Sequence, residues 1–245
     1  ALPYLSRAAE LDPALGDQAS GLAQNIRLAR LKEDPAYTLL EAGRGLGAMN
    51  EWALAAEAFR RAAQTRPDYA EAWAYLGEAI QQIPEAQSDA EGLAELERAL
   101  ELDPKSLSAH LFLSLYWQRQ GKLEQALGYL EKAAALYPDR PALQTEMGRV
   151  LALKGDLDAA GQAYQKASAL APQDPVYYRL LAAFSLEHNY QLTQTGLPAA
   201  RRALLLSPND PASLDTLGQV LLELGDIAGA KRFFERALLQ QADYA

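Results

Sequence analysis

The sequence predicts an all-α protein, a right-handed α-α superhelix (solenoid) of stacked helical hairpins. β-Branched residues, which suit a sheet, are scarce, because Leu occurs 44 times while Ile and Val together occur 7 times and Thr 6 times. An alanine followed five residues later by proline recurs at steps of 37, 34, 34 and 36 residues. Between these landmarks the apolar residues lie three or four positions apart, as in amphipathic helices. A repeat of this length that consists of two helices is typical of a solenoid.

The recurring alanine and proline set the predicted boundaries. The pairs are Ala62 and Pro67, Ala99 and Pro104, Ala133 and Pro138, Ala167 and Pro172, and Ala203 and Pro208. They predict one continuous solenoid over residues 36–245 with six units, about 36–69, 70–106, 107–140, 141–174, 175–210 and 211–245. The second unit has three added residues between its helices, and the fifth has two before Gly196.

Each unit is predicted to be a helix, a turn, a second helix and a proline corner. In the third unit Gly121 separates the two helical stretches, and Pro138 prevents the second helix from continuing. Counted from the start of each unit, positions 8, 20 and 27 hold only Gly, Ala or Ser, which predicts close approach of helix backbones there. Aspartates beside the prolines, among them Asp68, Asp139 and Asp210, are predicted to cap helix starts and turns.

The two ends depart from the pattern. Residues 1–13 resemble the second helix of a unit, and residues 17–33 predict one further helix with Leu22, Ile26, Leu28 and Leu31 on its apolar stripe, so 1–35 forms a partial repeat plus a degenerate or extra helix. The last helix carries Phe233, Phe234, Leu238 and Leu239, which are predicted to be uncovered. We therefore expect a piece of a longer protein, or an end that a further helix or another molecule covers.

With this frame the chain resembles the tetratricopeptide repeat family over about 210 of its 245 residues. In the first unit the family's positions 4, 7, 8, 11, 20, 24, 27 and 32 hold Leu39, Ala42, Gly43, Leu46, Ala55, Phe59, Ala62 and Pro67. The resemblance implies a concave groove lined by first-helix residues at positions 2, 5, 9, 12 and 13, where peptides or helices of partner proteins bind. The carboxylate clamp of the family's chaperone-binding members is disfavoured, because position 9 is never Asn and position 5 is never Lys.

Composition excludes several functional classes. The net charge of −9 opposes binding to nucleic acid. No apolar run approaches 18 residues, so membrane insertion is not expected. The absence of cysteine excludes disulfides and thiolate zinc sites, and fits a cytoplasmic protein, with a periplasmic or exported protein whose signal has been removed as the alternative.

No residue pattern predicts catalysis, a cofactor or a metal. There are two histidines: His110 occupies a packing position, and His188 beside Glu187 has no second histidine nearby. Gly43, Gly45 and Gly47 superficially resemble a phosphate loop, but no strand precedes them and no P-loop lysine follows. A locally flexible helix with Gly43 at a helix contact is the better interpretation. We therefore expect a protein that is not an enzyme.

The predicted function is a protein-protein interaction scaffold that binds a peptide or helix of a partner in the concave groove. Packing does not require arginine at the groove positions, so the candidate partner-binding residues are Tyr37, Arg44, Glu78, Leu111, Leu115, Arg119, Arg149 and Arg179. A recruiting or regulatory segment of a larger enzyme or secretion component is an alternative. Self-association through the terminal helices is another.

Overall fold

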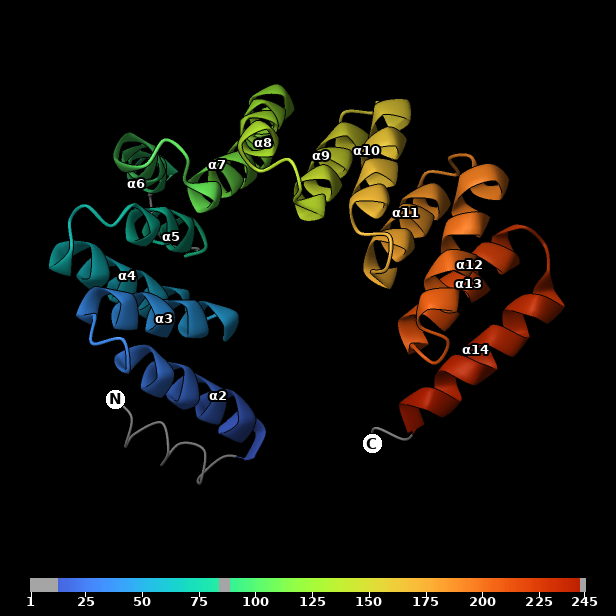
Figure 1. The fold of residues 1–245 in the computed structure, drawn as a ribbon, viewed down its shortest axis with the longest axis horizontal. Helices are drawn as coiled ribbons and strands as arrows, with labels where there is room; N and C mark the ends of the chain where they lie inside the picture. Colours follow the sequence, from blue (N-terminus) through green and yellow to red (C-terminus); the bar gives the residue numbers. More distant parts are fainter. Residues whose placement is uncertain (1–12, 84–88, 243–245) are drawn as a thin grey trace. The chain divides into compact units, whose positions relative to one another are not determined.

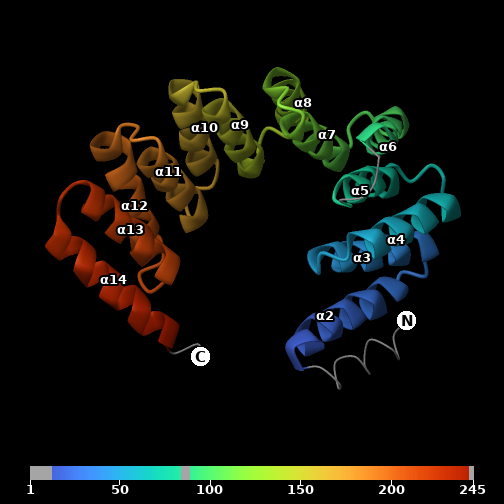
Figure 2. The same ribbon diagram turned by 180° about the vertical axis from the view of Figure 1, so that it is seen from behind.

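The computed structural model describes the backbone of residues 13–83 and 89–242 and the side chains of 20–83 and 90–240. Within these ranges every regular element is helical, and inside each of the two compact parts described below consecutive helices pack against one another (Figures 1 and 2). The all-α prediction is confirmed. The predictions for residues 1–12 and for the added residues at 84–88 lie outside the described residues.

The chain divides into two compact units, one ending at Tyr129 and the other beginning at Leu130, within a single helix. The first unit contains α2 (Pro13–Arg30), α3 (Pro35–Ala48), α4 (Trp52–Thr65), α5 (Ala70–Gln81), α6 (Asp89–Leu102), α7 (Leu107–Arg119) and the start of α8 (Leu123–Leu136). The second contains the rest of α8, then α9 (Pro141–Leu153), α10 (Leu157–Leu170), α11 (Pro175–Glu187), the π-helix η1 (Leu192–Gly196), α12 (Leu197–Leu206), α13 (Pro211–Glu223) and α14 (Ile227–Ala242).

Small residues allow the paired helices to approach closely, as the sequence predicts. A Cβ atom built on Gly77 of α5 would lie 2.6 Å from the carbonyl oxygen of Gly92 on α6. The same construction on Gly148 of α9 would meet the Tyr164 ring of α10 at 2.9 Å. Ala55 and Ala62 of α4 are fully buried. Larger side chains at these positions would overpack the contact between helices.

The three glycines of α3 each admit a different neighbouring side chain. Gly43 faces the ring of Phe59, Gly45 faces Leu22 of α2, and Gly47 faces the ring of Trp52. The helix continues without interruption through all three glycines. The prediction of a helix contact at Gly43 is confirmed, and the structure shows packing of the other two glycines where the sequence suggested local flexibility.

Aspartates start several of the helices. The Asp34 carboxylate accepts a hydrogen bond from the Tyr37 amide at the start of α3, and this bond holds the pKa of Asp34 below its usual value. Asp210 starts α13 in the same way, through the Ser213 amide. The predicted capping is wrong at α5 and α9, whose N-cap residues, Tyr69 and Arg140, make no side-chain capping bond.

Helix α2 begins earlier than predicted and buries a different stripe. It starts at Pro13, a residue that suits the first turn of a helix. Leu22 and Ile26 are buried as expected, together with Ala23 and Ala29, and the helix packs against α3. Leu28 and Leu31 are 56% and 78% exposed, so their assignment to the apolar stripe is wrong.

The two added residues before Gly196 are accommodated by a wide turn. Gln191 adopts a left-handed conformation with φ 42°, and the π-helix η1 follows it. The Thr195 amide donates to the Gln191 carbonyl over 2.7 Å. This turn places Gly196 against Ser185 of α11, where an added Cβ would lie 2.9 Å from the serine Cβ. The close contact between the two helices of this hairpin is therefore kept.

The apolar side chains of α14 divide between two faces. Phe233 and Phe234 pack against the core of the second unit, and Phe234 covers Gly218 of α13. The expectation that both phenylalanines are uncovered is therefore wrong. Leu238 and Leu239 are 65% and 67% exposed, in agreement with the prediction.

Candidate partner-binding surface

A pocket in the first unit opens between the first helices of successive hairpins, α3, α5 and α7. Its volume is about 290 Å³. We call it the Tyr75 pocket. It is lined by Gly43, Arg44, Gly47, Ala48, Trp52, Phe59, Tyr75, Glu78, Ala79 and Phe112. Two of the eight predicted binding residues, Arg44 and Glu78, are among them.

Aromatic rings form much of the pocket wall. The Tyr75 ring lies 5.4 Å from Phe59 and 5.0 Å from Phe112, the second pair meeting edge to face at 74°. Burial raises the pKa of the Tyr75 hydroxyl above its ordinary value. Because Gly43 and Gly47 have no side chains, the rings of Phe59 and Trp52 approach α3 closely and form part of the pocket wall. The result is a cavity suited to an apolar side chain.

Arg44 supplies the exposed positive charge at this pocket. Its Nη1 donates to the Glu41 carboxylate over 3.0 Å, and its guanidinium carbon lies 5.5 Å from the centre of the Tyr75 ring. The Arg44 side chain is 47% exposed. The Glu41 side chain is 19% exposed, so solvent screens this ion pair in part.

Glu78 is not free to bind a ligand, because it is paired with another predicted site residue. The two Nη atoms of Arg119 donate to its two carboxylate oxygens over 3.1 and 2.8 Å, and Gln82 donates to the same carboxylate over 2.7 Å. The Glu78 side chain is 10% exposed and that of Arg119 36%. The pair joins α5 to α7 and closes one side of the pocket.

The remaining predicted residues of the first unit do not line the pocket. Tyr37 is half-buried on α3, with the Lys32 ammonium 3.9 Å from its ring centre. Leu111 and Leu115 are half-buried on α7. All three lie on helices that contribute to the Tyr75 pocket.

The two predicted arginines of the second unit have different surroundings. Arg149 is exposed and donates to Glu146, three residues earlier on α9, over 2.7 Å. Arg179 of α11 is half-buried and lies 3.4 Å from the carboxylate of Asp210 at the start of α13. Arg179 therefore links two hairpins through an ion pair, whereas the ion pair of Arg149 lies within one helix.

Tyr75 and Phe112 were absent from the residues that the sequence predicts for this surface. Both occupy position 6 of their repeats, residues 70–106 and 107–140. Position 6 lies about one helical turn before the groove position 9, so the two positions share a helix face. An aromatic residue at this position in two consecutive units is the signal that could have identified them. Trp52 and Phe59 come from α4, and their approach to the pocket depends on the glycines of α3.

The described residues offer no arrangement for other chemistry. Among them no group of three or more His, Asp or Glu side chains could hold a metal ion. His110 is buried, with Nδ1 2.8 Å from the Ser106 carbonyl oxygen and its ring against Tyr129, in agreement with its predicted packing position. In the part of the chain that is described, no helix combines the length and hydropathy needed to cross a membrane.

Comparison with known proteins gives consistent matches. Three family models, each described as tetratricopeptide repeat, match residues 40–87 and 90–141, residues 118–184, and residues 212–244. The peroxisomal targeting signal receptor of Saccharomyces cerevisiae is 29% identical over 75% of this chain and 31% of its own length. Protein FlbA of Caulobacter vibrioides is 27% identical over 78% of this chain and 31% of its own length.

A second targeting signal receptor and two solved structures extend the comparison. The Komagataella phaffii peroxisomal targeting signal receptor is 40% identical over 34% of this chain and 14% of its length. The chain thus spans between 14% and 31% of these curated relatives. A chain of the APC/C hetero-tetramer Cut9-Hcn1 matches with a TM-score of 0.63 at 20% identity, over 98% of this chain and 49% of that one. A thermophilic TPR protein of Thermus thermophilus matches with a TM-score of 0.59 at 25% identity, over 76% of this chain and 99% of that one.

The repeat pattern, the pairing of the helices and the family models agree. The chain belongs to the tetratricopeptide repeat family.

Proposed function

We propose that this chain is a non-enzymatic scaffold that binds a segment of another protein on the face formed by the first helices of its hairpins. The Tyr75 pocket is the observation that carries the proposal. Its volume of about 290 Å³ is at the lower end of the range for small-molecule sites, roughly 300–1,000 Å³, and suits one large apolar side chain better than a cofactor. Membership of a family of protein-binding repeats supports the same function.

The pocket and its surroundings define the chemistry of the proposed partner. An apolar side chain of the partner fills the space beside Tyr75 and Phe112, and a carboxylate one or two residues away pairs with Arg44. The bound segment continues over Tyr37, Leu111 and Leu115, whose half-buried side chains add apolar surface. Glu78 and Arg119 hold the pocket wall and make no direct contact with the partner in this proposal.

A pocket-filling substitution tests the proposal. Ala48 is exposed and lines the pocket, so Ala48→Trp places an indole in the space that the partner needs without changing the core. Ala94→Trp adds the same group at an exposed position of α6 outside the pocket. Each variant and the unsubstituted chain are used to capture proteins from an extract of the native host, and the retained proteins are quantified by mass spectrometry.

The expected result is a partner whose retention falls at least about tenfold with Ala48→Trp and stays unchanged with Ala94→Trp, as for loss of a central anchor. Arg44→Glu should weaken the same partner further as salt is lowered, because repulsion between like charges is less screened. Equal retention by both tryptophan variants contradicts a role for this pocket.

A recruiting segment of a larger protein is the second candidate. It is supported by the peroxisomal targeting signal receptor and FlbA matches, in which the aligned 195 and 191 residues make up 31% of the whole protein. Sequencing the complete reading frame and measuring the mass of the native polypeptide distinguish the two. A native mass equal to that of the 245 residues would exclude the second candidate.

A further inference from the structure

A second groove lies in the second unit, on the side formed by the second helices of the last two hairpins. It runs between α12 and α14 above α13, which packs against both, and its volume is about 500 Å³. Its floor is apolar, with Leu204 of α12, Leu217 and Leu221 of α13, and Phe233 of α14. We call it the arginine groove. It shares no residue with the Tyr75 pocket.

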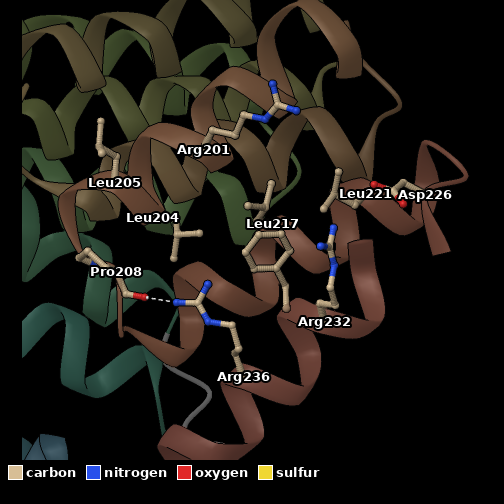
Figure 3. A pocket seen from close by; sticks show the side chains of 10 residues that line it. Arg201, Leu204, Leu205, Pro208, Leu217, Leu221, Asp226, Arg232 and Arg236 are labelled. Carbon is tan, nitrogen blue, oxygen red and sulfur yellow. Dashed lines mark hydrogen bonds between the residues drawn. The ribbon is translucent and has the colours of Figure 1, made fainter. Parts of the chain in front are cut away.

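Three arginines stand along this groove. Arg201 projects from α12, while Arg232 and Arg236 project from α14 on the opposite side, with Leu217 between them (Figure 3). One carboxylate also lines the groove, that of Asp226, and it accepts the Gly229 amide over 2.8 Å at the start of α14. The titratable side chains of the groove therefore sum to two positive charges, in a chain whose net charge is −9.

The fold uses one of the three arginines. Arg236 donates through Nη2 to the Pro208 carbonyl over 3.2 Å (Figure 3). Arg202 occupies the equivalent position of the preceding repeat, residues 175–210, and donates to the Pro172 carbonyl over 3.4 Å. This bond ties α12 and α14 to the proline corners before them, so Arg236 has a structural role.

Arg201 and Arg232 have no such role. Both are exposed, and neither forms an ion pair or hydrogen bond with any residue in the described part of the chain. In the first predicted repeat, residues 36–69, the position equivalent to Arg201 holds Arg60. Arg60 forms ion pairs with Glu57 over 3.4 Å and with Glu91 over 3.7 Å. In the other five predicted repeats, the position equivalent to Arg232 is not occupied by a basic residue. Neither arginine is explained by the packing of the repeats.

We propose that the arginine groove binds an acidic segment of a partner protein whose large apolar side chains are flanked by carboxylates. The apolar side chains enter the groove over Leu217 and Phe233, and the carboxylates pair with Arg201 and Arg232 on its two sides. A guanidinium at each side offers planar, two-donor recognition of carboxylate, which an ammonium group does not. Because the chain as a whole is acidic, long-range electrostatics favour the approach of an acidic segment to this groove over most of the remaining surface.

Synthetic peptides provide the probe. A fluorescein-labelled 12-residue peptide containing four Glu, two Leu and one Phe is compared with one carrying Gln for each Glu and one carrying Ala for each Leu and Phe. Fluorescence anisotropy gives the Kd of each peptide at low and at physiological salt. We expect the first peptide to bind at least about tenfold more tightly than either of the others, and its binding to weaken as salt rises.

Charge-matched variants locate the site. Arg201→Glu with Arg232→Glu should weaken the first peptide at least about tenfold, whereas Arg140→Glu with Lys166→Glu, which alters the charge equally at exposed positions elsewhere in the second unit, should change the Kd less than twofold. The neutral pair Arg201→Gln and Arg232→Gln serves if the glutamate variant does not fold. Ala48→Trp should leave this binding unchanged, which separates the groove from the proposed function of the Tyr75 pocket.

Three outcomes overturn the proposal. They are failure of the first peptide to bind, equal binding of all three peptides, and binding that does not respond to the arginine variants. Vesicles containing phosphatidylglycerol form a further arm. Arginine-dependent binding to these vesicles without binding to the acidic peptide would assign the groove to a membrane surface and refute a protein partner.

Discussion

Arg119 of α7 holds the carboxylate of Glu78 on α5 through both Nη atoms, at 3.1 and 2.8 Å, across 41 residues of sequence. Glu78 is almost fully buried, so loss of its partner would leave a carboxylate with little access to water. The pair therefore fixes the relative position of two first helices beside the Tyr75 pocket.

Removing one member of this pair should destabilise the protein. Arg119→Ala is expected to cost about 1–3 kcal/mol, below the full value for a buried pair because Arg119 is 36% exposed. Urea unfolding gives the change in free energy. Arg149→Ala, which breaks the exposed pair with Glu146, is the control and should cost less than about 1 kcal/mol. Equal costs for the two variants would show that the buried pair adds no more stability than the exposed one.

Two glycines should respond in opposite directions to replacement by alanine. Gly77→Ala places a Cβ 2.6 Å from the Gly92 carbonyl oxygen and should cost about 1–3 kcal/mol through overpacking. Gly128 lies within α8 with nothing within 4 Å of an added Cβ, so Gly128→Ala should add about 0.5–1 kcal/mol of stability through helix propensity. Thermal and urea unfolding measure both. A stable Gly77→Ala variant would refute the tight contact between α5 and α6.

The Asp210 carboxylate should make stability depend on acid pH. Burial by itself raises the pKa of Asp210, but the hydrogen bonds from the Ser213 hydroxyl and amide and the charge of Arg179 outweigh burial and lower it. Since the pKa is lower in the folded state, this stabilisation is complete above the unfolded value, about 3.9, and is lost as the pH falls below it.

Asp210→Asn keeps a helix-capping side chain but removes this titration. The difference in unfolding free energy between the unsubstituted chain and this variant should be constant from pH 7 to about 5 and shrink towards pH 3. Asp139→Asn, at an exposed site, controls for the loss of one negative charge. A difference that grows on acidification would contradict the lowered pKa.

Two tryptophans differ in the hydrogen bonding of their indole N–H groups. Trp73 donates to the Pro67 carbonyl over 2.9 Å, whereas the Nε1 of Trp117 is buried and forms no hydrogen bond with the described residues. Trp73→Phe should therefore lose about 0.5–1.5 kcal/mol from this bond in addition to packing. Trp117→Phe removes an N–H whose burial is unfavourable, so it should cost less. Unfolding of both variants in urea tests the order, and the reverse order would count against it.

The sequence was sufficient for the repeat architecture because its evidence is periodic. Small residues recur at fixed positions of every repeat, with Gly77, Ala99 and Ser114 as examples. Close packing of the helices explains each of them. The stripe of α2 was assigned wrongly because Ala23 and Ala29 bury little apolar surface and give a weak signal, while the exposed Leu28 and Leu31 give a strong one.

The candidate surface was only partly predictable for a related reason. Helix periodicity identifies the face on which Arg44 and Glu78 lie, but it does not identify which charges neutralise each other across separate hairpins. The pairs Glu78 with Arg119 and Asp210 with Arg179 depend on side-chain directions set by packing. Periodicity also does not reveal that a pocket lined by Gly43, Gly47 and Tyr75 is present.

The wide turn at Leu192–Gly196 shows how a repeat of this chain can accommodate extra residues. It absorbs the extra residues inside the fifth hairpin and still brings Gly196 against Ser185. Insertions at this turn can therefore leave the packing of the following hairpin unchanged, because the first helix of that hairpin has its own N-cap at Asp210. Divergence in length among related sequences should accordingly concentrate at such corners, while the intervals within the paired helices stay fixed.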